Sequence, residues 1–285
     1  MPRILIAGCG YVGEAAADLF NARGWEVEGW TASAQSAARL CAKPYAVRAL
    51  DISDAAAVSS MRGHFDVVLQ CASSGGGGPE EYRRVYLAGA CNLIAVFPTA
   101  TLLFTSSTSV YAQEEGEIVD ETSPAQPGHE TGCILRETEE LVLANSGIVA
   151  RLGGIYGPGR SFFLRKFLAG ERVIDRAGAR FINQAHRDDI VSALFLLAQH
   201  RAELGGQTYN VVDDEPATAR QVYEWLSLEL KPPPPQEKSS AKRKRGESNK
   251  RVSNKKLRVL GWEPRYPNFR VAMTESVLPS FGIER

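Results

Sequence analysis

A doubly wound α/β fold of the Rossmann type, built on a parallel sheet, is the fold class that this sequence predicts. Short apolar runs of strand length alternate with helical patterns through the first two thirds of the 285 residues. Such alternation is typical of parallel strands joined by right-handed helical crossovers. The first strand pattern also leads through a glycine-rich turn directly into a helix pattern, as dinucleotide-binding domains do.

Each element follows from its own apolar pattern. Strands are expected at residues 4–7, 26–30, 46–50, 67–71, 102–106 and 148–152. Helices are expected between them at residues 14–23, 55–62, 79–97 and 133–146. Farther on, the patterns predict helices at residues 162–169, 188–199 and 217–229, a short strand near 172–175, and another strand of the main sheet at 208–212.

The glycine turn is the most informative motif. Gly8, Gly10 and Gly13 follow the first strand in the pattern G-x-G-x-x-G, and an amphipathic helix pattern follows them. A phosphate can approach backbone N–H groups closely only where no Cβ intervenes, and a helix N-terminus offers free donors with a partial positive charge. The turn therefore predicts a dinucleotide site, with Tyr11 and Val12 as further cofactor contacts.

The patterns also divide the chain into two regions. Residues 1–157 and 183–215 are expected to form the Rossmann domain. Residues 158–182 and 216–285 are expected to form a smaller substrate-binding region, with a basic, proline-flanked loop at residues 231–250. The basic stretch continues to Lys256, and we interpret it as a mobile loop.

Composition narrows the range of partners. Lys plus Arg equals Asp plus Glu at 33 each, so no global field favours nucleic acid or a membrane surface. The basic run at residues 242–245 has no interleaved aromatic residues, and we do not expect nucleic acid to bind.

The first strand leaves no room for a signal peptide, and no run approaches a bilayer span, so a cytoplasmic protein is expected. We expect a monomer or a homodimer. Five cysteines without a C-x-x-C pair predict free thiols and no metal site.

Further motifs accompany the glycine turn in order along the chain. They are TSSTSVY at residues 105–111, RLGGIYGP at 151–158, HRDD at 186–189 and a closing segment at 250–264. Together they resemble the extended short-chain dehydrogenase/reductase family, which includes the NAD-dependent epimerases and dehydratases. The resemblance covers nearly the whole chain. It implies a Rossmann-type domain, a smaller C-terminal substrate domain and a cleft between them, and it does not by itself imply activity.

The resemblance implies further cofactor contacts. Asp51 and Ile52 match the family's adenine-contacting pair, in which the carboxylate accepts a hydrogen bond from the exocyclic amine. Ala72 and Ser73 end the next strand, where the family lets the backbone pass close to the cofactor.

The residues after the second strand favour NADP over NAD. An NAD site usually carries Asp or Glu about 20 residues past the glycines, where the carboxylate binds the ribose 2′-hydroxyl and repels a 2′-phosphate. Thr31 occupies that place and Ser33 follows, so no negative charge repels the phosphate. Arg39 is the nearest basic candidate to pair with the phosphate, and its alternative role is a solvated helix residue.

The family's catalytic Tyr-x-x-x-Lys pair is missing from this sequence. Alignment on Glu140 places Arg136 at the lysine position and Gly132 at the tyrosine position. Glycine has no proton to give, whereas arginine stays charged and can still donate to the cofactor's ribose hydroxyls. Ser107 stands where the resemblance implies a serine that polarises a carbonyl. Ser107 and Arg136 are therefore candidate catalytic residues, and Arg136 is also a candidate cofactor contact.

Two more residues are candidates for the site. Tyr86 lies in the predicted helix at 79–97, where relatives more often carry an asparagine facing the cofactor cleft, and it is a candidate acid or a packed aromatic. Arg180 matches a position where nucleotide-sugar enzymes bind the substrate phosphate, with a surface ion pair as the alternative. Asp188 and Asp189 are expected to cap the following helix.

Two functions remain open on the sequence alone. The first is an NAD(P)-dependent oxidoreductase, epimerase or dehydratase acting on a hydroxylated small molecule. In one form of this hypothesis, the substrate is linked to a nucleotide. The scaffold and Ser107 favour this hypothesis. The alternative is a catalytically silent protein that senses NADP(H), which the missing tyrosine favours.

Overall fold

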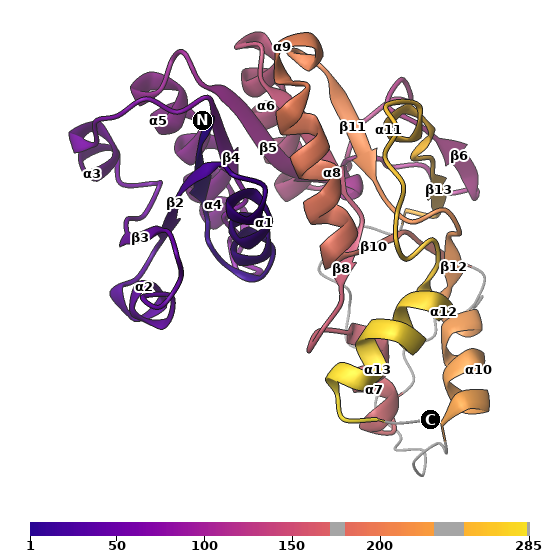
Figure 1. Ribbon diagram of the computed structural model, residues 1–285. Coiled ribbons are helices and arrows are strands. Elements are labelled where there is room, and N and C mark those ends of the chain that lie inside the picture. Colours follow the sequence, from indigo (N-terminus) through magenta and orange to yellow (C-terminus); the bar gives the residue numbers. More distant parts are fainter. Residues whose placement is uncertain (172–179, 231–247, 284–285) are drawn as a thin grey trace.

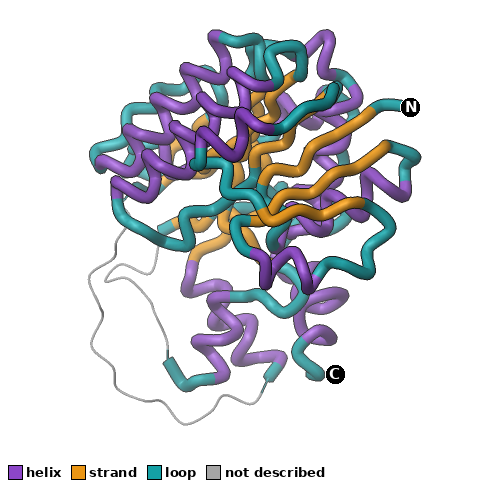
Figure 2. The backbone as a smooth tube through the Cα atoms, turned by 90° about the vertical axis from the view of Figure 1, so that its left-hand side faces the viewer, coloured by secondary structure: helices purple, strands orange, loops and turns teal. Residues whose placement is uncertain are grey.

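A seven-stranded, all-parallel sheet runs through the centre of the protein (Figure 1; Figure 2). The computed structural model describes residues 1–171, 180–230 and 248–283. The strand order is β11-β7-β5-β4-β1-β2-β3. These strands are β1 (Arg3–Ala7), β2 (Glu26–Thr31), β3 (Ala46–Ala49), β4 (Val67–Gln70), β5 (Thr101–Ser107), β7 (Ile148–Leu152) and β11 (Thr208–Val211). The predicted Rossmann-type sheet is confirmed.

The sheet extends in opposite directions from the boundary between β1 and β4. β2 and β3 follow β1 on one side, whereas β5, β7 and β11 follow β4 on the other. β1 pairs with β2 on one side and with β4 on the other, so that Ile6 lies opposite both Gly29 and Leu69. In doubly wound sheets, ligands bind outside the carboxyl ends of the strands at such a boundary. Gly8 and Cys71 follow β1 and β4 directly and therefore lie at the expected cofactor position.

Helices cover both faces of the sheet because both faces are apolar. Ile4 and Ile6 of β1 belong to the core that contains α1 (Tyr11–Ala22) and α8 (Arg187–Gln199). Leu5 and Ala7 point to the opposite face and belong to a second core. This second core is covered by α3 (Ala55–Ser60), α5 (Gly89–Val96) and α6 (Glu130–Ala144).

Shorter helical segments complete this part of the chain. They are α2 (Ala34–Arg39), α4 (Pro79–Tyr82), the π-helical η1 (Arg83–Ala88), the 3₁₀ turn η2 (Thr108–Val110) and α9 (Arg201–Leu204). The long helix predicted at residues 79–97 is thus α4 and α5 with a π-helical segment between them.

A second lobe lies below the sheet in Figure 1. It contains α7 (Phe162–Leu168), α10 (Ala219–Glu229), α12 (Phe269–Ala272), the π-helical η3 (Met273–Val277) and α13 (Leu278–Ser280). These segments share a core of their own, which includes Phe167, Tyr223 and Phe269. We keep the proposed division into a Rossmann domain and a smaller region on this basis.

Three two-stranded sheets accompany the main sheet. β6 (Glu117–Val119) pairs with β13 (Lys250–Val252), β8 (Gly154–Tyr156) pairs with β10 (Gln184–His186), and β9 (Phe181–Ile182) pairs with β12 (Ala217–Thr218). One of them, β6 with β13, pairs strands of the two regions. β13 is followed by α11 (Lys255–Val259). The prediction of a mobile loop through Lys256 is therefore wrong for its last part, because Lys250 and Val252 are buried on alternate positions of a paired strand.

The predicted capping role of Asp188 and Asp189 is also wrong. His186 is the N-cap of α8, since its side chain accepts a hydrogen bond from the backbone N–H of Asp188. Asp189 is buried and accepts hydrogen bonds from the backbone N–H groups of Arg265 and Tyr266, at 2.7 and 3.1 Å. It fixes the closing segment of the chain onto α8.

Two sequence predictions fall on other parts of the chain. The short strand near residues 172–175 and most of the proline-flanked loop, residues 231–247, lie outside the described residues. Within the described residues, no helix has the length and apolar character needed to cross a membrane.

Candidate functional site

The glycine turn brings β1, β4 and α1 into close contact. Gly8 has a φ of +115°, and a Cβ built on it would lie 2.2 Å from the backbone nitrogen of Ala72. A Cβ on Gly13 would lie 2.1 Å from the carbonyl oxygen of Gly8. A Cβ on Gly10 would meet nothing within 4 Å. Gly8 and Gly13 are thus required by packing, whereas the space in front of Gly10 is open to a ligand.

The start of α1 is prepared for an anion. Gly10 is its N-cap and supplies no side-chain hydrogen bond, so the N–H groups of the first turn face outward without a capping side chain. Tyr11 points toward the second region, where its hydroxyl donates to the carbonyl oxygen of Pro158 at 3.0 Å. The guanidinium groups of Arg160 and Arg187 lie 5.1 and 5.2 Å from the centre of the Tyr11 ring. Tyr11 therefore connects the glycine turn to the second region.

The end of β2 carries no acidic side chain. Thr31 is buried, and its hydroxyl donates to the carbonyl oxygen of Ser33 at 3.1 Å. Ser33 caps α2 by accepting from the backbone N–H of Ser36. Arg39, at the end of α2, forms an ion pair with Glu14 at 3.0 Å, and its side chain is 60% exposed. An exposed pair of this kind contributes at most about 1 kcal/mol, so Arg39 can change partners at low cost.

The predicted adenine contacts lie after β3. The Asp51 carboxylate accepts from the backbone N–H and hydroxyl of Ser53 and from the guanidinium of Arg84. Partial burial raises the pKa of Asp51, but the hydrogen bonds from Ser53 and Arg84 outweigh it and bring the pKa below its usual range. The carbonyl oxygen of Ile52 accepts from Asn92 at 2.9 Å. Asp51 therefore stays ionised and able to accept from an amine.

A cavity of about 980 Å³ joins the glycine turn to the second region. Its lining on the Rossmann side includes Val12, Ala72, Ser73, Tyr86 and Ser107. On the other side it is lined by parts of α7, β9 and β13 and the segments around them, including Arg180. The cavity thus brings together several of the predicted cofactor residues, two of the three predicted catalytic residues and the predicted substrate residue.

Ser107 lies at the end of β5 and starts η2. Its Oγ accepts a hydrogen bond from the backbone N–H of Ser109 at 3.1 Å. Because this contact uses a lone pair of the oxygen, the hydroxyl proton remains available to a molecule in the cavity. The arrangement fits the role expected for this serine.

Tyr86 sits in the π-helical segment η1. Its ring makes edge contacts with Tyr82 and Phe104, and its hydroxyl accepts from the backbone N–H of Ser74 at 3.4 Å. The buried Gln70 side chain donates to the carbonyl oxygen of Tyr86 at 3.0 Å and also to the preceding carbonyl. Gln70 therefore satisfies backbone groups in the π-helical turn, and such turns are frequent at functional sites.

Gly132 stands at the position that the alignment on Glu140 gives to the family's tyrosine, and this position is closed by packing. The backbone N–H of Gly132 donates to Nδ1 of His129, which is the N-cap of α6. A Cβ on Gly132 would lie 2.5 Å from Cβ of Pro127 and 2.6 Å from Cε1 of His129. No side chain fits at residue 132 unless these neighbours move.

Arg136 is not among the residues that line the large cavity. It forms ion pairs with Glu139 and with Glu140, the latter at 3.1 Å, and it lines a separate recess of about 600 Å³. Leu135 is the α6 residue that lines the large cavity. The roles proposed for Arg136 in catalysis and cofactor binding thus require its guanidinium to leave these two carboxylates.

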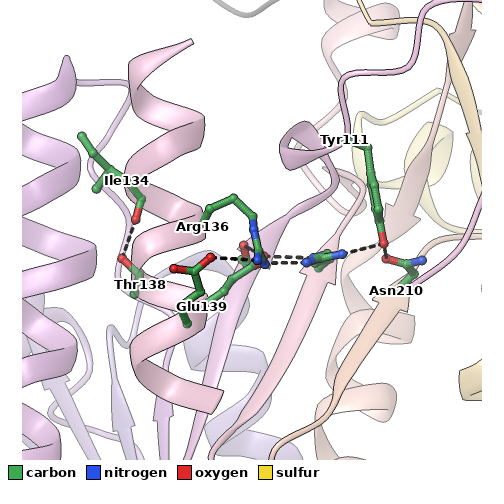
Figure 3. A network of polar contacts seen from close by, with 9 residues as sticks. Tyr111, Ile134, Arg136, Thr138, Glu139 and Asn210 are labelled. Atoms are coloured by element: carbon green, nitrogen blue, oxygen red, sulfur yellow. Dashed lines mark hydrogen bonds and ion pairs between the residues drawn. The ribbon is translucent and has the colours of Figure 1, made fainter. Parts of the chain in front are cut away.

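Behind the cavity, α6, β5, β7 and β11 are joined by a polar network (Figure 3). Glu139 accepts two hydrogen bonds from Arg151, at 3.0 and 2.7 Å, and Arg151 also donates to the hydroxyl of Tyr111 at 2.8 Å. The Tyr111 hydroxyl donates to Asn210 at 3.0 Å. The network also includes the hydroxyl of Ser106, which donates to Glu139 at 2.6 Å. These residues are buried and hold the strand ends that carry Ser107.

Lys250 is a cavity residue that the sequence patterns did not indicate. Its exposed fraction is 5%, and its Nζ donates to the carbonyl oxygen of Tyr111 at 2.7 Å and to Oγ of Ser248 at 2.8 Å. Arg180 donates from Nε to the carbonyl oxygen of Ser248 at 2.6 Å. The basic composition of the surrounding stretch concealed Lys250, and the apolar Val252 two residues later was the available signal of a strand.

The charge of the cavity lining has one sign. Among the described residues that line it, five are basic and none is acidic. The basic residues are Arg160, Arg165, Lys166, Arg180 and Lys250. Lys166 pairs with Glu171 outside the lining, and Arg165 donates to the carbonyl oxygen of Gly159. The field in the cavity therefore favours an anion.

Comparison with known proteins gives matches over most of the chain. A family model described as the NAD dependent epimerase/dehydratase family matches residues 4–211. Protein YeeZ of Escherichia coli (strain K12) is 31% identical over 281 residues, which cover 94% of this chain and 97% of YeeZ.

Solved structures give the same architecture. A putative NAD-dependent epimerase/dehydratase from Methylobacillus flagellatus has a TM-score of 0.77 and 27% identity, and the match covers 99% of this chain and 96% of that one. The UDP-glucose 4-epimerase of Thermus thermophilus, in complex with NAD, has a TM-score of 0.79 and 21% identity, with 99% of both chains covered. The latter likeness concerns the fold alone.

Proposed function

This chain belongs to the NAD dependent epimerase/dehydratase family, and on that premise we propose that it is an NADP-dependent enzyme acting on a hydroxylated, negatively charged small molecule. The observation that carries the proposal is the large cavity. It runs from the glycine turn, past Ser107, to a lining whose described charged residues are all basic. Such a cavity has room for a nicotinamide ring and a substrate together.

The residues of the turn fit a nicotinamide dinucleotide. Gly8 and Gly13 pack so closely that a Cβ on either would clash, and Gly10 faces open space beside an uncapped helix start. We assign the pyrophosphate to Gly10, Tyr11 and Val12, and the adenine to Asp51 and Ile52. Ala72 and Ser73 would pass beside the ribose. The bound cofactor would supply the acceptor or donor of a hydride.

We favour NADP because of the end of β2. Thr31 and Ser33 are uncharged there, and neither repels a 2′-phosphate. Arg39 is held only by an exposed ion pair with Glu14, which a phosphate can replace. Arg39 is therefore the proposed partner of the 2′-phosphate.

We propose that the chain's own residues divide the work as follows. The free hydroxyl proton of Ser107 would donate to a substrate oxygen and polarise it. Arg180 would bind an anionic group of the substrate, a phosphate in a nucleotide-linked molecule. Tyr86 remains a candidate acid, since it lines the same cavity. Arg136 would act only after leaving Glu139 and Glu140.

Calorimetry and absorbance together test the proposal. Titration with NADP⁺ and NAD⁺ should give binding, tighter for NADP⁺. Absorbance at 340 nm should then report cofactor reduction with UDP-glucose or with a panel of phosphorylated sugars and hydroxy acids. Ser107→Ala should lower kcat/KM by about 100-fold while the Kd of the cofactor stays the same. Ser107→Thr, which keeps the hydroxyl, is the matched control.

A different result would contradict the enzyme. If NADP⁺ binds but no compound of the panel is oxidised, reduced, epimerised or dehydrated, and Ser107→Ala changes nothing, the protein is a cofactor-binding protein without turnover. This is the silent-sensor alternative, and the closed position at Gly132 is the feature that agrees with it.

A further inference from the structure

Lys250 is buried without a negative partner among the described residues. It lies on β13, is 5% exposed and lines the large cavity. A buried lysine is ordinarily paired with a carboxylate, because removing an isolated charge from water is costly. The described part of the chain provides no carboxylate within ion-pair distance of Lys250, and its two hydrogen-bond partners there are a carbonyl and a hydroxyl. Within the described part of the chain, no salt bridge accounts for its burial.

The charges around Lys250 favour its neutral form. Glu117 is its register partner on β6, but this residue is exposed and its carboxylate accepts from the backbone N–H of Glu115. Among the described residues, Arg180, which adjoins β9 and lines the cavity, is a charged side chain that acts on Lys250. Burial, together with the positive charge of Arg180, lowers the pKa of Lys250 to about 8. A measurable fraction of Lys250 is then a free amine at neutral pH.

The hydrogen bonds of Lys250 leave one position of Nζ open. As an ammonium, the group has three N–H donors, of which Tyr111 and Ser248 take two. As an amine, it keeps the same two N–H contacts, and its lone pair occupies the third position. The side chain can therefore exchange a proton at this position without losing either protein contact.

From this geometry we propose that Lys250 exchanges a proton with the substrate hydroxyl or carbonyl, in place of the tyrosine that the chain lacks. The inference rests on the proposed function, because it needs a substrate that gains or loses a hydride in this cavity. Lys250 would then be a catalytic residue, whereas Arg136 would remain a structural residue of α6.

The step balances as follows. When a substrate alcohol is oxidised, its O–H bond breaks and the proton forms a new N–H bond on the amine of Lys250. A C=O bond would form as the hydrogen on the same carbon is lost with its electron pair, for which the bound cofactor would supply the acceptor. In the reverse direction the ammonium of Lys250 returns the proton to the oxygen. One two-electron oxidation thus matches one two-electron reduction, and Lys250 changes only its protonation.

The position of Lys250 suits this role. The carbonyl that it contacts belongs to Tyr111, and only the 3₁₀ turn η2 separates Tyr111 from Ser107. Tyr111 is itself fixed by Arg151 and Asn210 (Figure 3). The loop that presents Ser107 therefore also holds Nζ of Lys250, and both side chains line one cavity.

The first experiment needs no substrate. The whole protein is labelled with traces of acetic anhydride over a range of pH from neutral to alkaline, and the acetylation rate of each lysine is measured by mass spectrometry. The exposed Lys255 is the internal reference. We expect the rate at Lys250 to rise with a midpoint near pH 8, below the ordinary range of lysine. A midpoint in the ordinary range of lysine, or no labelling of Lys250 in the folded protein, would overturn the proposal.

The second experiment uses variants with whichever compound the wild type turns over. Lys250→Met should lower kcat about 100-fold or more, and the acidic limb of the pH profile of alcohol oxidation, with its inflection near pH 8, should disappear. Lys250→Arg keeps a positive charge but cannot serve as a base, so it should be as slow. Lys256→Met is the matched control, because Lys256 also donates to a backbone carbonyl, that of Thr208, outside the cavity lining. Calorimetric NADP⁺ affinity and the unfolding midpoint verify that each variant folds.

The outcomes separate the two proposals. If Lys250→Arg retains the wild-type rate and pH profile, Lys250 is a structural or anion-binding residue and the inference is wrong, although the enzyme stands. If the wild type turns over no compound, the proposed function fails. The labelling midpoint then still decides whether Lys250 can exchange a proton with the cavity.

Discussion

Glu139 of α6 and Arg151 of β7 form a buried, bidentate ion pair, with N···O distances of 3.0 and 2.7 Å (Figure 3). Glu139 also accepts from Ser106, and Arg151 also donates to Tyr111, so both charges are satisfied on several sides. The pair fixes helix α6 to the strand ends that present Ser107. It therefore connects the stability of the fold with the geometry of the cavity.

Removal of Glu139 should be strongly destabilising. Glu139→Ala leaves the Arg151 guanidinium buried without its counter-charge, and we expect a loss of about 3–5 kcal/mol in the free energy of unfolding. Urea denaturation followed by circular dichroism measures it. Glu140→Ala is the control, because Glu140 is 68% exposed and should change stability by less than about 0.5 kcal/mol. Equal effects of the two substitutions would contradict this interpretation.

Two glycines of the turn should respond differently to alanine. Gly8→Ala combines a positive φ with a Cβ 2.2 Å from Ala72, so it should lower the unfolding midpoint sharply, with strain alone costing about 1–3 kcal/mol. Gly10→Ala meets open space and should change stability by no more than about 1 kcal/mol. Its methyl group should nevertheless weaken NADP⁺ binding at least tenfold. Calorimetry would refute the assigned pyrophosphate site if Gly10→Ala bound as tightly as the wild type.

Arg39 should determine the preference for the 2′-phosphate. A charge-assisted contact contributes about 1.5–3 kcal/mol, so Arg39→Ala should weaken NADP⁺ binding by roughly 10-fold to 100-fold and leave NAD⁺ binding unchanged. Arg48→Ala is the control, since Arg48 is similarly exposed and pairs with Glu28 on the neighbouring strand. A parallel loss for both nucleotides, or none, would assign Arg39 to its ion pair with Glu14 alone.

His186 and Asp189 should make the free energy of unfolding change with pH in opposite directions. Burial lowers the pKa of His186 from 6.5 to about 4, so the unfolded chain binds more protons between these values and stability rises with pH. Burial raises the pKa of Asp189 from 3.8 to about 6, so the folded chain binds more protons there and stability falls as pH rises. The two contributions oppose each other between about pH 4 and 6.

Single substitutions should reveal each contribution. In Asp189→Asn, the free energy of unfolding should rise with pH between about 4 and 6.5 more steeply than in the wild type. In His186→Asn, the free energy of unfolding should fall as the pH rises from about 4 to 6. Urea unfolding at closely spaced pH values measures both slopes, and profiles parallel to the wild type would disprove the assignments.

Gly132 should resist any larger side chain. Gly132→Ala places a Cβ against Pro127 and His129 and should lower the unfolding midpoint. Gly128→Ala is the control, because a Cβ at residue 128 meets nothing within 4 Å. If Gly132→Ala is as stable as Gly128→Ala, the start of α6 has room to move, and a catalytic tyrosine could be reintroduced there.

The local pattern of apolar residues and glycines was sufficient to predict the main sheet and the glycine turn. The runs at residues 4–7 and 67–69 are fully apolar because both faces of a parallel sheet are buried, and the turn after Gly8 is contiguous in sequence. The site on the other side of the cavity could not be found this way. Lys250 reaches Tyr111 across 139 residues, through a strand of three residues within a basic stretch. No local periodicity reports such a contact.

The predicted roles on α6 show a second limit. Alignment on Glu140 placed Arg136 at the lysine position, whereas in the fold Leu135 lines the cavity and Arg136 is turned toward Glu139 and Glu140. Adjacent helix residues differ by about 100° in direction. A shift of one residue in an alignment therefore exchanges a position that lines the cavity for one that does not.

The sequence by itself determined the Rossmann-type scaffold, the glycine turn and the absence of an acidic residue after β2, because apolar periodicity and close backbone approach are local properties. Tertiary structure decided which charges meet. Among the described residues, it buried Glu139 against Arg151, placed Lys250 near Arg180 with no carboxylate beside it, and closed the space above Gly132. These relationships depend on burial and on contacts between segments far apart in the chain, and only the folded packing fixes both.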